Sequence, residues 1–241
     1  MRRIAATLAV ATLLIVGVQT FAGEDAGKDK SCSKAKACCA SKAADAAKGL
    51  LASLPPDVPK MRCMVGDEVR HCPMDAEKLS KETGKPIHYF LGEKEFESRE
   101  QIAQAYAKEL EGYLTKITAV SYGVGDQCVN CPMKAKQIAK KEGKDVEYRL
   151  ASFRFDCQDM ASKKAAAARK AADGVALTMT VAEKSYHCPT KAADAAKACG
   201  KPVQYKVGNQ MVADENLARI LLALTKIEAA VKEIEPPAKR G

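Results

Sequence analysis

The chain has 241 residues, of which 39 are Lys or Arg and 30 are Asp or Glu, so its formal net charge is +9. An apolar content of 47% with few Gly and Pro excludes collagen-like, coiled-coil and wholly disordered chains. The lysines are scattered among acidic residues and aromatics are only 5%, so the charge indicates solvated helix faces rather than nucleic-acid binding. The ten cysteines are the feature of the composition that needs an explanation.

The first 22 residues have the pattern of a secretory signal peptide. Arg2 and Arg3 precede an almost unbroken apolar run over residues 4–18, and Thr20-Phe21-Ala22 offers small residues for cleavage. The run is shorter than the roughly 20 residues of a membrane span, which favours cleavage over an anchor. We therefore expect a soluble periplasmic or secreted protein without stable membrane insertion. Export would place the cysteines in oxidising surroundings, where disulfides are permitted.

Residues 23–59 form a segment rich in Cys, Lys and Ala that ends in a proline-marked linker over residues 54–59. Cys32, Cys38 and Cys39 cluster in this segment, where they could wrap a soft metal ion or form disulfides. We predict a helix over residues 41–51.

Three copies of one unit follow the linker. Their Cys-Pro pairs begin at Cys72, Cys131 and Cys188, which are 59 and 57 residues apart. Each cysteine is followed twelve residues later by Gly-Lys and seventeen residues later by Tyr, and it is preceded by an acid at five residues and by Val at seven. So many shared offsets identify a repeat. We predict units over residues 60–117, 118–174 and 175–235, with a tail over 236–241.

Each unit predicts the order strand, helix, strand, strand, helix. The proline after the cysteine favours a helix start, and the conserved spacing to Gly84, Gly143 and Gly200 favours a helix end there. The closing helices carry an apolar stripe, which in the middle unit is mostly alanine. The predicted fold is therefore α+β, with three tandem βαββα units whose ferredoxin-like antiparallel sheets pack against helices.

The repeated cysteines are the first candidates for chemistry. Cys72, Cys131 and Cys188 are predicted at helix N-termini, where free backbone N–H groups and the helix dipole stabilise a thiolate. This placement suits metal binding or thiol exchange. The alternative is that each cysteine is only a small cap and core contact. His71 and His187 immediately precede two of the cysteines and could add imidazole ligands.

The middle unit has two further cysteines. Cys128 lies three residues before Cys131, and Cys157 follows the last predicted strand of the unit. If the first and third strands lie side by side and parallel, these three thiols converge. They would then form a trigonal soft-metal site, or a disulfide with a spare thiol. Cys63 and Cys199 are expected to be core or disulfide residues.

Part of the middle unit is similar to a known family. The similar residues belong to the loop, the helix and the turn after it: Val124-Gly125, Cys128, Cys131, Ala135, Ile138 and Gly143. In this pattern the unit resembles the heavy-metal-associated domain, the ferredoxin-like module of copper and mercury carriers. The resemblance implies that Cys128 and Cys131 bind a soft ion between a strand and a helix.

The sequence therefore predicts an exported protein that binds a soft or borderline metal ion, such as copper or zinc, through thiolates. The candidate ligands are Cys128, Cys131, Cys157, Cys72, Cys188, His71 and His187. One alternative is thiol–disulfide exchange through Cys128 and Cys131, and another is a disulfide-stabilised structural or interaction protein. Hydrolytic catalysis is not expected, because no repeated His/Asp pair accompanies the cysteines. The predicted partner is the metal ion, and the sequence does not identify a protein partner.

Overall fold

The computed structural model describes residues 46–235. The predicted signal peptide over residues 1–22, the cluster of Cys32, Cys38 and Cys39, and the tail over residues 236–241 lie outside these residues. The first described element is a helix over residues 46–53, which confirms the predicted helix from residue 46 to residue 51.

Each unit consists of four strands, a short helix and a long helix. The first unit comprises β1 (Met61–Val65), β2 (Glu68–Arg70), α2 (Pro73–Thr83), β3 (Ile87–Leu91), β4 (Lys94–Phe96) and α3 (Arg99–Thr118). The second comprises β5 (Ser121–Val124), β6 (Gln127–Val129), α4 (Pro132–Glu142), β7 (Glu147–Leu150), β8 (Phe153–Phe155) and α5 (Gln158–Asp173). The third comprises β9 (Leu177–Val181), β10 (Lys184–Tyr186), α6 (Pro189–Cys199), β11 (Gln204–Val207), β12 (Gln210–Val212) and α7 (Glu215–Ile234).

The three sheets are antiparallel and share one topology, which confirms the predicted α+β fold. Their strand orders are β2-β1-β3-β4, β6-β5-β7-β8 and β10-β9-β11-β12. Each unit has one strand more than predicted, because the opening segment is a hairpin rather than a single strand. The acid five residues before each cysteine lies in the turn of this hairpin. In the third unit both turn residues, Ala182 and Glu183, have positive φ, at 49° and 71°.

The repeated Gly-Lys pairs have a local structural cause. Gly84 ends α2 in a left-handed conformation, with φ 69°, which glycine adopts without a steric penalty. The following residue, Lys85, reaches over the hairpin turn at Gly66, where a Cβ would lie 2.7 Å from Lys85 Cδ. Lys144 lies over Gly125 in the same way. The pair therefore ends the short helix and covers the hairpin turn.

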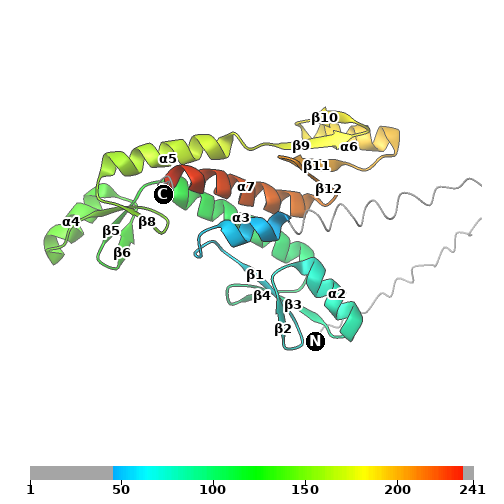
Figure 1. Ribbon diagram of the computed structural model, residues 1–241, viewed down its shortest axis with the longest axis horizontal. Coiled ribbons are helices and arrows are strands. Elements are labelled where there is room, and N and C mark those ends of the chain that lie inside the picture. The colour runs from blue at the N-terminus through cyan, green and yellow to red at the C-terminus, as the bar shows by residue number, and fades with distance from the viewer. Residues whose placement is uncertain (1–45, 236–241) are drawn as a thin grey trace, which may run out of the picture.

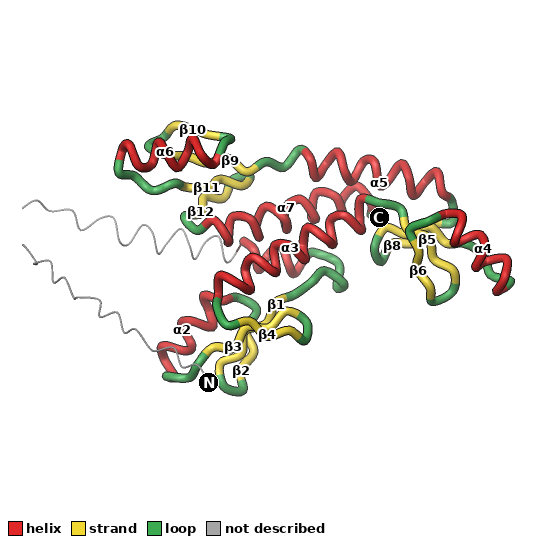
Figure 2. Tube along the Cα trace, turned by 180° about the vertical axis from the view of Figure 1, so that it is seen from behind, coloured by secondary structure: helices red, strands yellow, loops and turns green. Residues whose placement is uncertain are grey.

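The long helices α3, α5 and α7 pack against one another and join the three units (Figure 1). Figure 2 shows the same three helices side by side from behind, with the small sheets and the short helices at the periphery. Ile102, Leu110, Leu224 and Ile227 are fully or almost fully buried in their shared core. No helix within residues 46–235 has the length and apolarity that crossing a membrane requires.

Candidate thiol sites

The three repeated cysteines are the N-cap residues of the short helices, as the sequence predicts. Cys72 precedes α2, Cys131 precedes α4 and Cys188 precedes α6, each with an extended backbone. Proline follows at the first helical position, where its missing N–H costs no hydrogen bond. The N–H groups of the next residues are therefore free to interact with the cysteine sulfur.

Cys188 shows the chemical effect of this position. Its sulfur has no cap hydrogen bond, but the nearby backbone N–H groups of Lys191 and Thr190 lower the pKa of the Cys188 thiol, with a smaller contribution from the Thr190 hydroxyl. The side chain is exposed, so solvent and dissolved ions reach it. The third unit therefore presents a stabilised thiolate at its surface.

The first unit surrounds its cysteines differently. Cys72 is only 7% exposed, whereas Cys131 and Cys188 are exposed. Cys63 on β1 is fully buried, and burial, reinforced by Cys72 and Glu77, raises the pKa of its thiol to about 12. Cys63 is thus a protonated core residue. Of its two predicted roles, core or disulfide, the structure confirms the core role.

The expected convergence of three thiols in the middle unit is wrong. Strand β7 lies between β5 and β8, so the first and third predicted strands are not neighbours. Cys128 is on the edge strand β6, and Cys157 follows the opposite edge strand β8 as the N-cap of α5. Four strands about 4.8 Å apart separate the two edges of such a sheet by about 14 Å. The sheet order therefore does not bring Cys157 to Cys128 and Cys131.

Cys128 and Cys131 also lie on different sides of their sheet. Cys128 pairs with Gly123 on the neighbouring strand, in the same row as Glu147. Strand alternation places this row on the face opposite α4, while Cys131 begins α4 itself. The two thiols of the Cys-x-x-Cys motif are therefore not presented on one face in this conformation.

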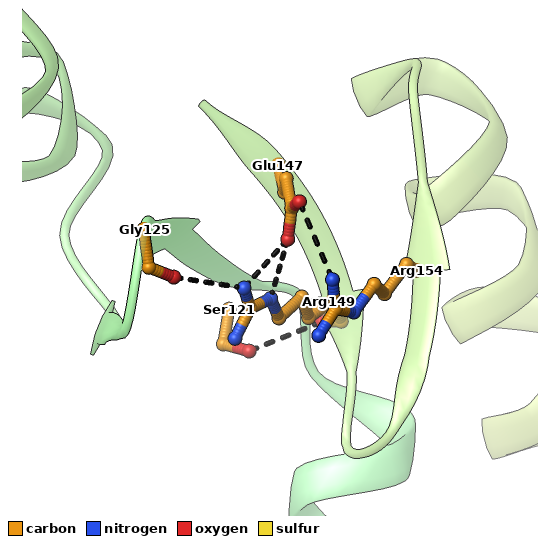
Figure 3. A network of polar contacts seen from close by, with 5 residues as sticks. All are labelled: Ser121, Gly125, Glu147, Arg149 and Arg154. Atoms are coloured by element: carbon orange, nitrogen blue, oxygen red, sulfur yellow. Dashed lines mark hydrogen bonds and ion pairs between the residues drawn. The ribbon is translucent and has the colours of Figure 1, made fainter. Parts of the chain in front are cut away.

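The face that carries Cys128 is polar and charged. Arg149 lies over Gly123 and donates to Glu147 at 2.6 and 3.0 Å and to the carbonyl oxygen of Gly125 at 3.2 Å (Figure 3). Arg154 approaches the same carboxylate at 3.6 Å. The Arg149 hydrogen bonds lower the pKa of Glu147. Cys128 thus lies beside a compact ion-pair network.

The two histidines differ in their contacts. The ring Nδ1 of His71 lies 3.0 Å from the carbonyl oxygen of Met61, whereas His187 is exposed beside Cys188. Within residues 46–235, no three side chains of the His, Cys, Asp and Glu types come together as a metal site. The seven cysteines of the same range are all free thiols. Cys199 is exposed at the end of α6, so its predicted burial or pairing is wrong for this structure.

A small cavity beside Cys72 is a feature that the sequence did not predict. Its volume is about 60 Å³, and Met61, Met74 and Tyr106 contribute to its wall. The rest of the wall includes residues of helix 46–53, α3 and α7, which are separated from Cys72 in the sequence. The only sequence signal was that methionines occur close to Cys72 on both sides.

No family model matches the chain, and it has no match among curated proteins or solved structures. The resemblance of the middle unit to the heavy-metal-associated domain stays a prediction.

Proposed function

We propose that the chain is an exported protein that binds soft or borderline metal ions through thiolates at the N-termini of α2, α4 and α6. The supporting observation is the threefold placement of cysteine as a helix N-cap. The lowered pKa of Cys188 illustrates how such a position favours the thiolate, which is the form that binds metals.

The ligand chemistry sets the class of ion. Thiolate sulfur prefers Cu(I), Zn(II) and related soft ions to Ca(II) or Mg(II). Cys131 and Cys188 are exposed, so an ion bound there can exchange with solvent or with another carrier. This favours transport or buffering of metal over a purely structural metal site.

Metal titration of the reduced chain tests this proposal. The wild type is titrated anaerobically with Cu(I) and with Zn(II), beside the triple variant Cys72→Ser, Cys131→Ser and Cys188→Ser. Cys199→Ser is the matched control, because Cys199 is an exposed cysteine at the other end of α6. We expect the triple variant to bind fewer equivalents and the control to bind as the wild type does. Absence of bound metal in the wild type would refute the proposal.

Thiol–disulfide exchange is a second candidate function, which the exposure of both Cys128 and Cys131 favours and their placement on different sides of the sheet disfavours. This activity requires both sulfurs, because one attacks the substrate and the other resolves the mixed disulfide. Insulin reduction by the wild type should therefore be lost in Cys128→Ser. Activity that persists in this variant would argue against the second candidate.

A further inference from the structure

The cavity beside Cys72 is small and mostly apolar. It lies between the first unit, helix 46–53 and α7, and its volume is about 60 Å³. Leu51, Leu217 and Leu224 supply part of its apolar wall. The cavity has room for a single ion together with ordered water.

The remaining wall contains four side chains that prefer soft metals. Cys72 contributes a thiol at the start of α2, Met61 and Met74 contribute thioethers, and His71 contributes an imidazole. Met61 is 6% exposed and Cys72 is 7% exposed, so both sulfurs are shielded from bulk water. Sulfur and imidazole together form a donor set that suits copper.

The hydrogen bond of His71 favours metal binding by its ring. When Nδ1–H donates to the Met61 carbonyl oxygen at 3.0 Å, the imidazole is neutral and its Nε2 carries the free lone pair. Metal-binding histidines commonly have their other ring nitrogen fixed by a backbone carbonyl in this way. His71 is also exposed, so it offers a route for an ion from solvent.

Only the first unit combines all four groups. The positions that correspond to Met61, His71 and Met74 are Val120, Asn130 and Met133 in the second unit and Leu177, His187 and Thr190 in the third. In addition, only the first unit has its N-cap cysteine buried, since Cys131 and Cys188 are exposed.

Charge selects a monovalent ion. Thioethers and a neutral imidazole carry no charge, so one thiolate compensates one positive charge and the complex is neutral. The ionised side chains that also line the cavity carry two positive and two negative charges (Lys48, Arg99, Glu100 and Asp214), so a divalent ion would still keep one uncompensated positive charge. Cu(I) combines the required charge with a preference for sulfur ligands.

Tyr106 gives an independent indication that the cavity holds a ligand. Tyr106 is fully buried and lines the cavity, and its hydroxyl has no hydrogen-bond partner within the described residues. Buried hydroxyl groups nearly always have a partner. On metal binding the Cys72 thiol becomes a thiolate, which is a stronger hydrogen-bond acceptor for a hydroxyl in the same cavity.

We propose that Cys72, Met61, Met74 and His71 bind one Cu(I) ion in this cavity. The inference rests on the proposed function and adds the ion and the complete ligand set for one of the three thiols. The mouth of the site is bordered by Arg99, which pairs with Glu77 at 3.1 Å and with Asp214 at 3.5 Å and so links the first and third units.

Methyl NMR of the full reduced chain, labelled with [¹³C-methyl]methionine, tests this inference. The eight methionine signals are followed during an anaerobic Cu(I) titration until all thiols are saturated, and they are assigned from Met→Leu variants. We expect the Met61 and Met74 methyl signals to shift, and both shifts to disappear in Cys72→Ser. Met211 on β12 does not line the cavity and lies at the edge of its sheet away from Cys188, so its signal is the control and should not shift.

The outcomes separate this inference from the proposed function. Saturation with Cu(I) without a shift of the Met61 or Met74 signal would overturn the cavity site and leave thiolate binding standing. Failure of the wild type to bind Cu(I) would overturn both. If Cys72→Ser does not fold, Met61→Leu/Met74→Leu replaces it, because Leu conserves the volume of Met. This double variant should release Cu(I) to a chromophoric chelator at lower chelator concentration than Met211→Leu, and equal release would overturn the cavity site.

Discussion

At the scale of single residues, one repeated position has different chemistry in each unit. Cys188 is exposed beside backbone N–H groups that lower its pKa, whereas Cys72 is enclosed beside Tyr106 and two methionines. The sequence predicts the helix N-terminus for both residues because proline and the repeat spacing are local signals. It does not predict the burial of Cys72, because the covering side chains come from helix 46–53 and from α7.

The reactivity of Cys188 follows from the backbone N–H groups near its sulfur. The N–H groups of Lys191 and Thr190 stabilise the thiolate, so the pKa of Cys188 is lowered and the thiolate persists to lower pH. We expect the alkylation rate of Cys188 by iodoacetamide to reach half its maximum at a lower pH in the folded chain than in the unfolded chain. Peptide mass spectrometry over a pH series measures this midpoint. The same chain in denaturant is the control, and equal midpoints in both conditions would contradict the account.

Loss of the hydroxyl group should change the free energy of unfolding differently at two buried tyrosines. Tyr113 donates to Asp57 at 3.0 Å, so we expect Tyr113→Phe to lower the free energy of unfolding by about 2 kcal/mol. The Tyr106 hydroxyl has no partner within the described residues, so Tyr106→Phe should leave the metal-free protein equally or more stable. Urea unfolding of both variants makes the comparison. A loss in Tyr106→Phe as large as that in Tyr113→Phe would refute it.

At the scale of elements, the sequence predicts helix ends well and short strands poorly. Cys-Pro and Gly-Lys mark the bounds of α2, α4 and α6 through local backbone preferences. The three-residue strands β2, β6 and β10 are mostly exposed and therefore lack apolar alternation. The pairs Gly66-Asp67 and Gly125-Asp126 are turn sequences that indicate a hairpin in the first and second units. Missing these hairpins led to the wrong strand neighbours and to the wrong three-thiol site.

The hairpin turns offer a matched pair of substitutions. Gly66 has φ 60°, so a side chain there is strained, and Gly66→Ala should cost about 1–2 kcal/mol of unfolding free energy. Ala182 occupies the corresponding turn of the third unit with φ 49°, so Ala182→Gly should relieve strain and stabilise the protein by about 1 kcal/mol. Chemical denaturation measures both changes. Destabilisation by Ala182→Gly would show that backbone strain does not govern these turns.

At the scale of the whole molecule, the three units share a hydrophobic core and are not independent domains. Leu224 of α7 belongs to the same buried cluster as Ile102 and Tyr106 of α3. The repeat and the apolar stripes predict three similar units. They do not predict which stripes pack together, because that depends on contacts between residues more than one hundred positions apart.

Removing part of this shared core should affect distant units. Leu224 is fully buried, so Leu224→Ala should cost about 2–5 kcal/mol and should accelerate hydrogen exchange in α3 as well as in α7. Val181→Ala is the control, because Val181 lies in a separate cluster with Met179 and Ala192 inside the third unit. Exchange mass spectrometry resolves the two effects. Acceleration confined to the third unit in Leu224→Ala would contradict a shared core.

The central claim is that the thiols at the N-termini of α2, α4 and α6 bind the metal. Its most direct test is alkylation footprinting of the reduced chain with and without Cu(I), with each cysteine quantified by peptide mass spectrometry. The account predicts that Cu(I) slows alkylation of Cys72, Cys131 and Cys188 and leaves Cys199 unchanged. Equal alkylation of the three N-cap cysteines with and without Cu(I) would contradict it.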